Sequence, residues 1–231
     1  MKTLGTLFFA FFLVSVCSCQ QDNIETNEIS TIELDEKSAQ LVEADNTFGL
    51  EIFRKIRTES DKENIMISPL SISVALAMTY NGADGETKTE METVLNLNGL
   101  TADDINASYK MLIGALQSLD KDVALEIANA IYYSDNFSVK SDFISTNQNY
   151  YDAQVESLNF SSPSSVRTIN DWVAEKTNDK ILTIIEKLSP DDRMILLNAI
   201  YLMEFGARNS MRMELRLGIL KRKMEQSLKF R

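Results

Sequence analysis

Few residue types in this chain could carry out catalysis, because the 231 residues include no histidine. Ser-His-Asp and Cys-His catalysis are therefore excluded, and so are most zinc sites, since all of them depend on imidazole. The neighbouring carboxylates Asp103/Asp104 and Asp191/Asp192 could form acid–base pairs. Each pair precedes an apolar run, however, and fits a helix start or a turn better than a catalytic pair. With no glycine-rich phosphate loop and no metal-ligand spacing in the sequence, we expect no catalytic residue, metal or cofactor, and no enzyme.

The only two cysteines, Cys17 and Cys19, end a segment that has the form of a signal peptide. The apolar run at 4–16 is too short to span a bilayer. Val-Cys-Ser-Cys at 16–19 resembles a bacterial lipobox, in which cleavage precedes a cysteine that receives diacylglycerol, and Cys19 fits better because bulky Val16 precedes Cys17. We therefore expect residues 1–19 to be a lipoprotein signal peptide and the protein to be extracytoplasmic, anchored to a bacterial membrane through lipid on Cys19. Ordinary secretion with cleavage nearby is the alternative, and either way the mature chain has no disulfide.

The charge of the chain changes abruptly at Tyr201. Residues 1–201 carry 15 Lys+Arg and 31 Asp+Glu, a balance of −16, whereas residues 202–231 carry 8 and 3, a balance of +5. The net charge of −11 argues against binding to nucleic acid phosphates. Residues 20–44 are polar and acidic, which predicts a tether, with a short first helix or arm of the domain as the alternative.

Helix and strand signals alternate from Asp45 onward. Ser68-Pro69 should open a buried helix, Thr87 begins a capping-box pattern that predicts a further helix start, and Thr101 begins another. The near-continuous apolar run at 194–202 predicts a central strand covered on both faces. The remaining periodic segments predict helices at about 48–56, 101–119, 137–151 and 165–176, and strands at 123–132 and 154–160.

Within the region from Thr47 to Tyr201, eight short stretches together resemble the N-terminal half of a serpin. They include Asn-Ile-Met-Ile-Ser-Pro-Leu-Ser-Ile-Ser at 64–73 and the tetrapeptide Asn-Ala-Ile-Tyr, which occurs at both 129–132 and 198–201. Each stretch alone is weak, but their order is specific. The eight stretches are 64–73, 75–83, 85–87, 127–132, 150–153, 169–173, 177–181 and 197–201.

The resemblance implies an α+β fold over residues 45–202, the N-terminal half of the serpin fold, with helices packed on an incomplete large β-sheet. The strands that end at Tyr132 and Tyr201 would be the second and third of that sheet. By the same resemblance, Ser68, Ser71 and Asn198 match the polar cluster beneath the sheet that family members use to control its opening. Helix capping and a satisfied buried amide are the alternatives for these three residues.

The resemblance also implies a function, because serpins are mostly suicide inhibitors of serine or cysteine proteases. The protease cleaves an exposed reactive loop and is trapped when the loop inserts as an extra strand into the large sheet. The energy comes from a metastable fold that becomes more stable on insertion. Such an inhibitor supplies no catalytic group, so the lack of histidine is no objection.

The family pattern stops after Tyr201. Serpins continue there with an aromatic residue, Lys or Asn, Gly, Trp and Phe, whereas residues 202–210 read Leu-Met-Glu-Phe-Gly-Ala-Arg-Asn-Ser. If one nucleotide is restored after Leu202, permitted wobble choices let 203–216 begin Asn-Gly-Ile-Trp-Ser-Lys-Lys-Phe, which resembles the serpin continuation. We therefore expect the basic tail, residues 203–231, to be out-of-frame translation; a natural amphipathic tail for a membrane or partner helix is the alternative. The nucleotide sequence after codon 201 decides between them.

Because the reactive loop lies in the missing second half, we expect this chain to be inactive as an inhibitor. The alternative function is a non-inhibitory surface lipoprotein that binds or scaffolds through an exposed sheet edge, although such edges invite aggregation more often than function.

Overall fold

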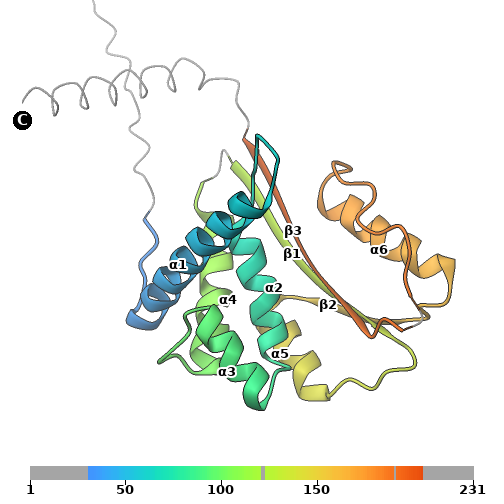
Figure 1. Cartoon of the computed structure of the whole chain (residues 1–231), viewed down its shortest axis with the longest axis horizontal. Coiled ribbons are helices and arrows are strands. Elements are labelled where there is room, and N and C mark those ends of the chain that lie inside the picture. Colours follow the sequence, from blue (N-terminus) through green and yellow to red (C-terminus); the bar gives the residue numbers. More distant parts are fainter. Residues whose placement is uncertain (1–30, 121–122, 190, 205–231) are drawn as a thin grey trace, which may run out of the picture.

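The computed structural model describes residues 31–120, 123–189 and 191–204, which form six helices and three strands (Figure 1). The predicted signal peptide with Cys19 and residues 205–231 of the basic tail lie outside the described residues. None of the described helices is long and apolar enough to cross a membrane. In chain order the elements are α1 (Glu36–Glu59), α2 (Pro69–Tyr80), α3 (Gly85–Val94), α4 (Ala102–Ser118), β1 (Val123–Ser134), α5 (Ser141–Tyr151), β2 (Gln154–Leu158), α6 (Pro163–Lys176) and β3 (Met194–Glu204).

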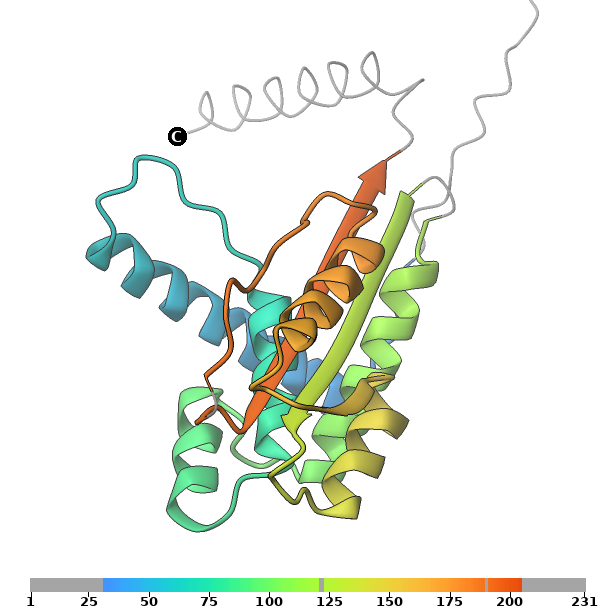
Figure 2. The same ribbon diagram turned by 90° about the vertical axis from the view of Figure 1, so that its right-hand side faces the viewer.

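The three strands form one sheet in the order β2-β1-β3, with β1 parallel to β2 and antiparallel to β3. Helices α1 to α5 lie on one side of this sheet and α6 lies on the other (Figures 1 and 2). The expected α+β arrangement, helices packed on a β-sheet, is therefore confirmed.

Strand β1 contributes to a separate core on each face of the sheet. Ile131 packs among the buried side chains of α1, α2 and α4, whereas Ala130 and Tyr132 pack with Trp172 and Ile169 of α6. Successive side chains of a strand point to opposite faces, so the alternation seen in the sequence explains both cores. Burial of Tyr132 also raises the pKa of its hydroxyl to about 12.

The prediction that 194–202 forms a central strand is half right. Helices α2 and α6 pack on the two faces of β3, which explains its near-continuous apolar sequence. Among the described residues, however, β1 is the central strand and β3 lies at the edge of the sheet. An apolar run indicates that both faces of a strand are buried, but it does not show whether another strand pairs with its hydrogen-bonding edge.

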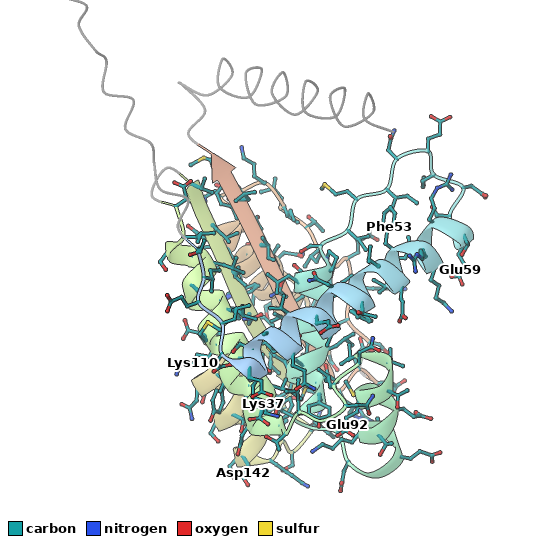
Figure 3. The ribbon with its side chains drawn as sticks, turned by 90° about the vertical axis from the view of Figure 1, so that its left-hand side faces the viewer. Lys37, Phe53, Glu59, Glu92, Lys110 and Asp142 are labelled. Atoms are coloured by element: carbon teal, nitrogen blue, oxygen red, sulfur yellow. The ribbon has the colours of Figure 1, made fainter. Side chains whose placement is uncertain are left out.

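The predicted tether ends too late in the sequence. Helix α1 begins at Glu36, and the carboxylate of Asp35 caps it by accepting a hydrogen bond from the Ser38 amide at 2.7 Å. Leu41 and Ala44 are buried against the domain. Residues 36–44 are therefore the first turns of α1, which is the alternative left open by the sequence. Figure 3 shows α1 running along the helical side, with Lys37 near its start and Glu59 at its end.

Two of the three predicted helix starts are confirmed and one is wrong. Pro69 opens α2 after the cap Ser68, and Thr101 caps α4 in a reciprocal capping box with Asp104. Thr87, by contrast, lies inside α3, which begins at Gly85 after the cap Asp84. The Asp84 carboxylate accepts a hydrogen bond from the Gly85 amide at 2.9 Å, so it takes the capping role that the sequence pattern gives to Thr87.

Candidate functional site

Two asparagine side chains join β1, β3 and the end of α5 beneath the sheet. Asn198 lies directly opposite Asn129 in the antiparallel register, and its Nδ2 donates to Asn129 Oδ1 at 2.8 Å. Asn129 Nδ2 in turn donates to the carbonyl oxygen of Tyr151 at 2.8 Å. Asn129 is only 3% exposed, so its hydrogen bond to Tyr151 is buried, and its hydrogen bond to Asn198 is partly buried. The pair therefore ties the edge strand to the central strand and to α5.

The amide of Asn198 is only half satisfied. Its Nδ2 has a partner, but its Oδ1 is buried and accepts no hydrogen bond from the part of the chain that the structure describes. A buried acceptor without a partner costs about 1–3 kcal/mol. The alternative of a fully satisfied buried amide is therefore not what the described residues show at this position.

Ser68 and Ser71 lie in the helix layer that covers the same face of the sheet. The Ser68 hydroxyl accepts a hydrogen bond from the Ser71 amide at 3.3 Å, which is ordinary helix capping. Ser68 is exposed and Ser71 is partly buried. Residues of α2 pack on the face of β3 that carries Asn198, yet among the residues that the structure describes no hydrogen bond joins either serine to that amide. Control of sheet opening by the three residues stays a prediction.

A further set of buried polar groups extends the amide pair into the helices, and the sequence did not reveal it. The Tyr151 hydroxyl donates to Asn106 Oδ1 at 2.7 Å, and Asn106 exchanges two 2.9 Å hydrogen bonds with Asn81. Tyr109 packs against the Tyr151 ring with centroids 6.0 Å apart. The available signal was the presence of Asn106 and Tyr109 on the buried side of α4.

The phenols of this network act as hydrogen-bond donors rather than as acids. Burial raises the pKa of the Tyr151 hydroxyl well above its usual range and does the same for Tyr109. Tyr109 donates to Asp45 Oδ1 at 2.7 Å. The pKa of the Asp45 carboxyl is raised by burial, a shift that the Tyr109 hydrogen bond opposes. At neutral pH both phenols keep their protons, so the network holds the helices together without proton-transfer chemistry.

The outer edge of β3 is the second part of the site. The Ser134 amide donates to the Arg193 carbonyl at 3.0 Å. This hydrogen bond shows that the odd-numbered residues of β3 direct their main-chain groups toward β1. Even-numbered residues of β3 therefore direct their N–H and C=O groups away from β1. No described strand pairs with that edge. Leu202 near its end is 66% exposed. Such an edge can accept an extended segment through main-chain hydrogen bonds.

The two carboxylate pairs have the structural roles that the sequence favoured. Asp104 belongs to the capping box of α4, where its own amide donates to Thr101 Oγ1 at 3.1 Å. Asp192 Oδ2 accepts a hydrogen bond from the Ser189 amide at 2.8 Å, which closes a turn. In the described ranges, no group of three or more acidic, cysteine or histidine side chains could hold a metal ion.

Comparison with known proteins places these features in a family context. A family model described as serpin (serine protease inhibitor) matches residues 43–204. An uncharacterized serpin-like protein of Methanosarcina acetivorans is 32% identical over 216 residues, covering 87% of this chain and 50% of the relative. Serpin B6 of Bos taurus is 36% identical over 167 residues, covering 70% of this chain and 44% of the relative. The chain thus spans about half the length of the curated relatives that it matches.

Solved structures agree with the sequence matches. The thermophilic serpin tengpin in the latent state superimposes with a TM-score of 0.63 at 38% identity, covering 73% of this chain and 44% of that one. Cleaved kallistatin complexed with heparin gives a TM-score of 0.67 at 28% identity, covering 71% of this chain and 49% of that one.

Proposed function

The chain belongs to the serpin family, and from this premise we propose that it derives from a serpin-type inhibitor of serine or cysteine proteases, not from an enzyme. In such an inhibitor a cleaved reactive loop inserts as an extra strand into the large sheet. The observation that carries the proposal is the edge of β3, a strand covered on both faces whose outward main-chain groups have no partner strand among the described residues. That edge is where an inserted strand would add.

We further propose that a polypeptide of these 231 residues does not trap a protease. The family match ends at residue 204, and the sequence after Tyr201 lacks the serpin pattern. Incubation with a panel of serine and cysteine proteases, followed by denaturing electrophoresis, should show the chain intact or degraded but never in a higher-mass adduct. A full-length inhibitory serpin in the same panel serves as the positive control. A stable adduct that survives denaturation would refute the proposal.

The location that we propose is an extracytoplasmic membrane surface, reached through a lipid on Cys19. The support is the lipobox-like sequence at 16–19 that follows an apolar run. Expression in a bacterium with an alkyne analogue of palmitate should label the wild-type chain and send it to the membrane fraction. Cys19→Ser should abolish both effects, whereas Cys17→Ser should retain them and is the matched control. Labelling that survives Cys19→Ser would overturn the assignment.

A second candidate function is a non-inhibitory surface lipoprotein that binds or scaffolds a partner. The exposed edge of β3 favours it, because an extended peptide could add there without any inhibitory mechanism. This function requires a folded monomeric chain, since pairing of the same edge between copies would occupy the site.

A further inference from the structure

The chain contains two Asn-Gly dipeptides, Asn81-Gly82 and Asn98-Gly99, in different environments. In such a dipeptide the glycine amide nitrogen can attack Cγ of the asparagine side chain, because glycine has no side chain to hinder the approach. The new N–Cγ bond closes a succinimide ring, the Cγ–Nδ2 bond breaks, and ammonia leaves. Water then opens the ring to aspartate or isoaspartate. Water is the only co-reactant, so the folded structure controls the rate through the freedom of the two reacting groups.

At Asn81 both reacting groups are held. Its Nδ2 donates to Asn106 Oδ1 and its Oδ1 accepts from Asn106 Nδ2, each at 2.9 Å. The Gly82 amide donates to the Thr79 carbonyl at 2.9 Å at the end of α2. The electrophile is therefore fixed in the buried polar network and the nucleophile is engaged in a turn. Attack at this dipeptide requires both arrangements to open.

At Asn98 both reacting groups are free. The residue is exposed, and neither its side-chain amide nor the Gly99 N–H makes a hydrogen bond within the described part of the chain. The turn itself is closed by the Leu100 amide, which donates to the Leu97 carbonyl at 3.1 Å. Gly99 has a φ of 86°, a conformation that suits glycine at the third position of a type II turn. The remaining restraints on the dipeptide act on its carbonyl groups and leave both reacting groups without a hydrogen bond.

We propose that Asn98 is a site of spontaneous deamidation in the folded protein and that Asn81 is protected. The modification adds a negative charge, and the isoaspartate product also lengthens the main chain by one carbon. The loop is poorly placed to absorb that change, because its neighbours Leu97 and Leu100 are buried, with 1% and 8% exposure.

Deamidation at Asn98 also affects the start of α1. Gln40 Nε2 donates to the Asn98 carbonyl at 2.9 Å, and Lys37 Nζ donates to the Gly99 carbonyl at 3.2 Å. Figure 3 labels Lys37 at this end of the helix. A rearranged turn moves both carbonyl groups, so the modified loop loses its hydrogen bonds to the first turns of α1. The product should be a less stable, aged form of the domain.

The test compares the two dipeptides within one protein. The full 231-residue chain is incubated at physiological pH and temperature, once in buffer and once in denaturant, and peptide mass spectrometry follows deamidation at each asparagine. The denatured sample supplies the intrinsic rates of the two sequences. We expect the ratio of the Asn98 rate to the Asn81 rate to be at least about tenfold larger in buffer than in denaturant, since local opening controls access.

Two outcomes decide the proposal. Asn98→Gln should remove the signal from the α3–α4 loop, including the isoaspartate detected by methyltransferase labelling, and leave the Asn81 rate unchanged. A ratio in buffer that rises by less than about tenfold over the denatured ratio overturns the proposal, because the fold would then protect both sites alike or neither.

Discussion

Replacing Asn129 by aspartate should lower the free energy of unfolding by about 3 kcal/mol or more. The substitution keeps the size of the side chain but puts an oxygen in place of Nδ2, which donates to the Tyr151 carbonyl in the wild type. Two acceptor oxygens then face each other at a site that is 3% exposed. The ionised carboxylate would keep one donor, the Asn198 amide, and would lose most of its hydration.

The stability of the Asn129→Asp variant should also depend on pH. Burial with the Asn198 amide as its one donor should raise the pKa of the new carboxyl in the folded state, and the neutral acid can donate to the Tyr151 carbonyl through its hydroxyl. Because the folded-state pKa of this carboxyl lies above its unfolded-state pKa, the stability that its protonation contributes is fully present below the unfolded pKa. That contribution is lost as pH rises through the folded pKa. The stability gap to the wild type should therefore shrink as pH falls toward about 4.

Urea unfolding at several pH values measures both effects. Glu126→Gln is the matched control. It makes the reverse exchange, a carboxylate oxygen for an amide nitrogen, at an exposed position of the same strand. That control should change stability by no more than about 0.5 kcal/mol. If Asn129→Asp costs as little as Glu126→Gln, the amide pair does not hold β1, β3 and α5 together.

The repeated tetrapeptide allowed the sequence to predict two strands but not the contact between their side chains. Asn-Ala-Ile-Tyr at 129–132 and at 198–201 predicted two strands of one sheet, and both strands are present. The antiparallel register sets the first residues of the two copies opposite each other, so Asn129 and Asn198 bond side chain to side chain. Alternation assigns a residue to a face of a strand, but it does not give the partner, which here lies 69 residues away.

Errors at the helix starts have a different cause. Asp84 and Thr87 are both good capping residues and both precede Met91, so local preference alone could not rank them. At α1, Leu41 and Ala44 lie on one helical face with Phe48, but the acidic residues around them suggested a solvated tether. Helix α1 packs against α4 and α2, and these are tertiary contacts that no short window of sequence contains.

Gly49→Ala should destabilise the domain by about 1–3 kcal/mol, even though alanine is the better helix former. A Cβ atom at Gly49 would lie 2.7 Å from Pro69 Cβ and 3.1 Å from Pro69 Cγ. Neither atom belongs to a flexible side chain, because both are part of the ring that opens α2. The added methyl group must therefore push α1 and α2 apart, and α2 is the helix that packs on β3.

Gly114→Ala separates this steric effect from helix propensity. Gly114 lies inside α4, and apart from its chain neighbours and the backbone of its own helix no atom within the described ranges comes within 4 Å of an added Cβ there. It should therefore stabilise the domain by up to about 1 kcal/mol, the usual advantage of alanine over glycine in a helix. Thermal or urea unfolding should thus move the two variants in opposite directions. If Gly49→Ala also stabilises, the close approach of α1 to Pro69 is not a feature of the folded chain.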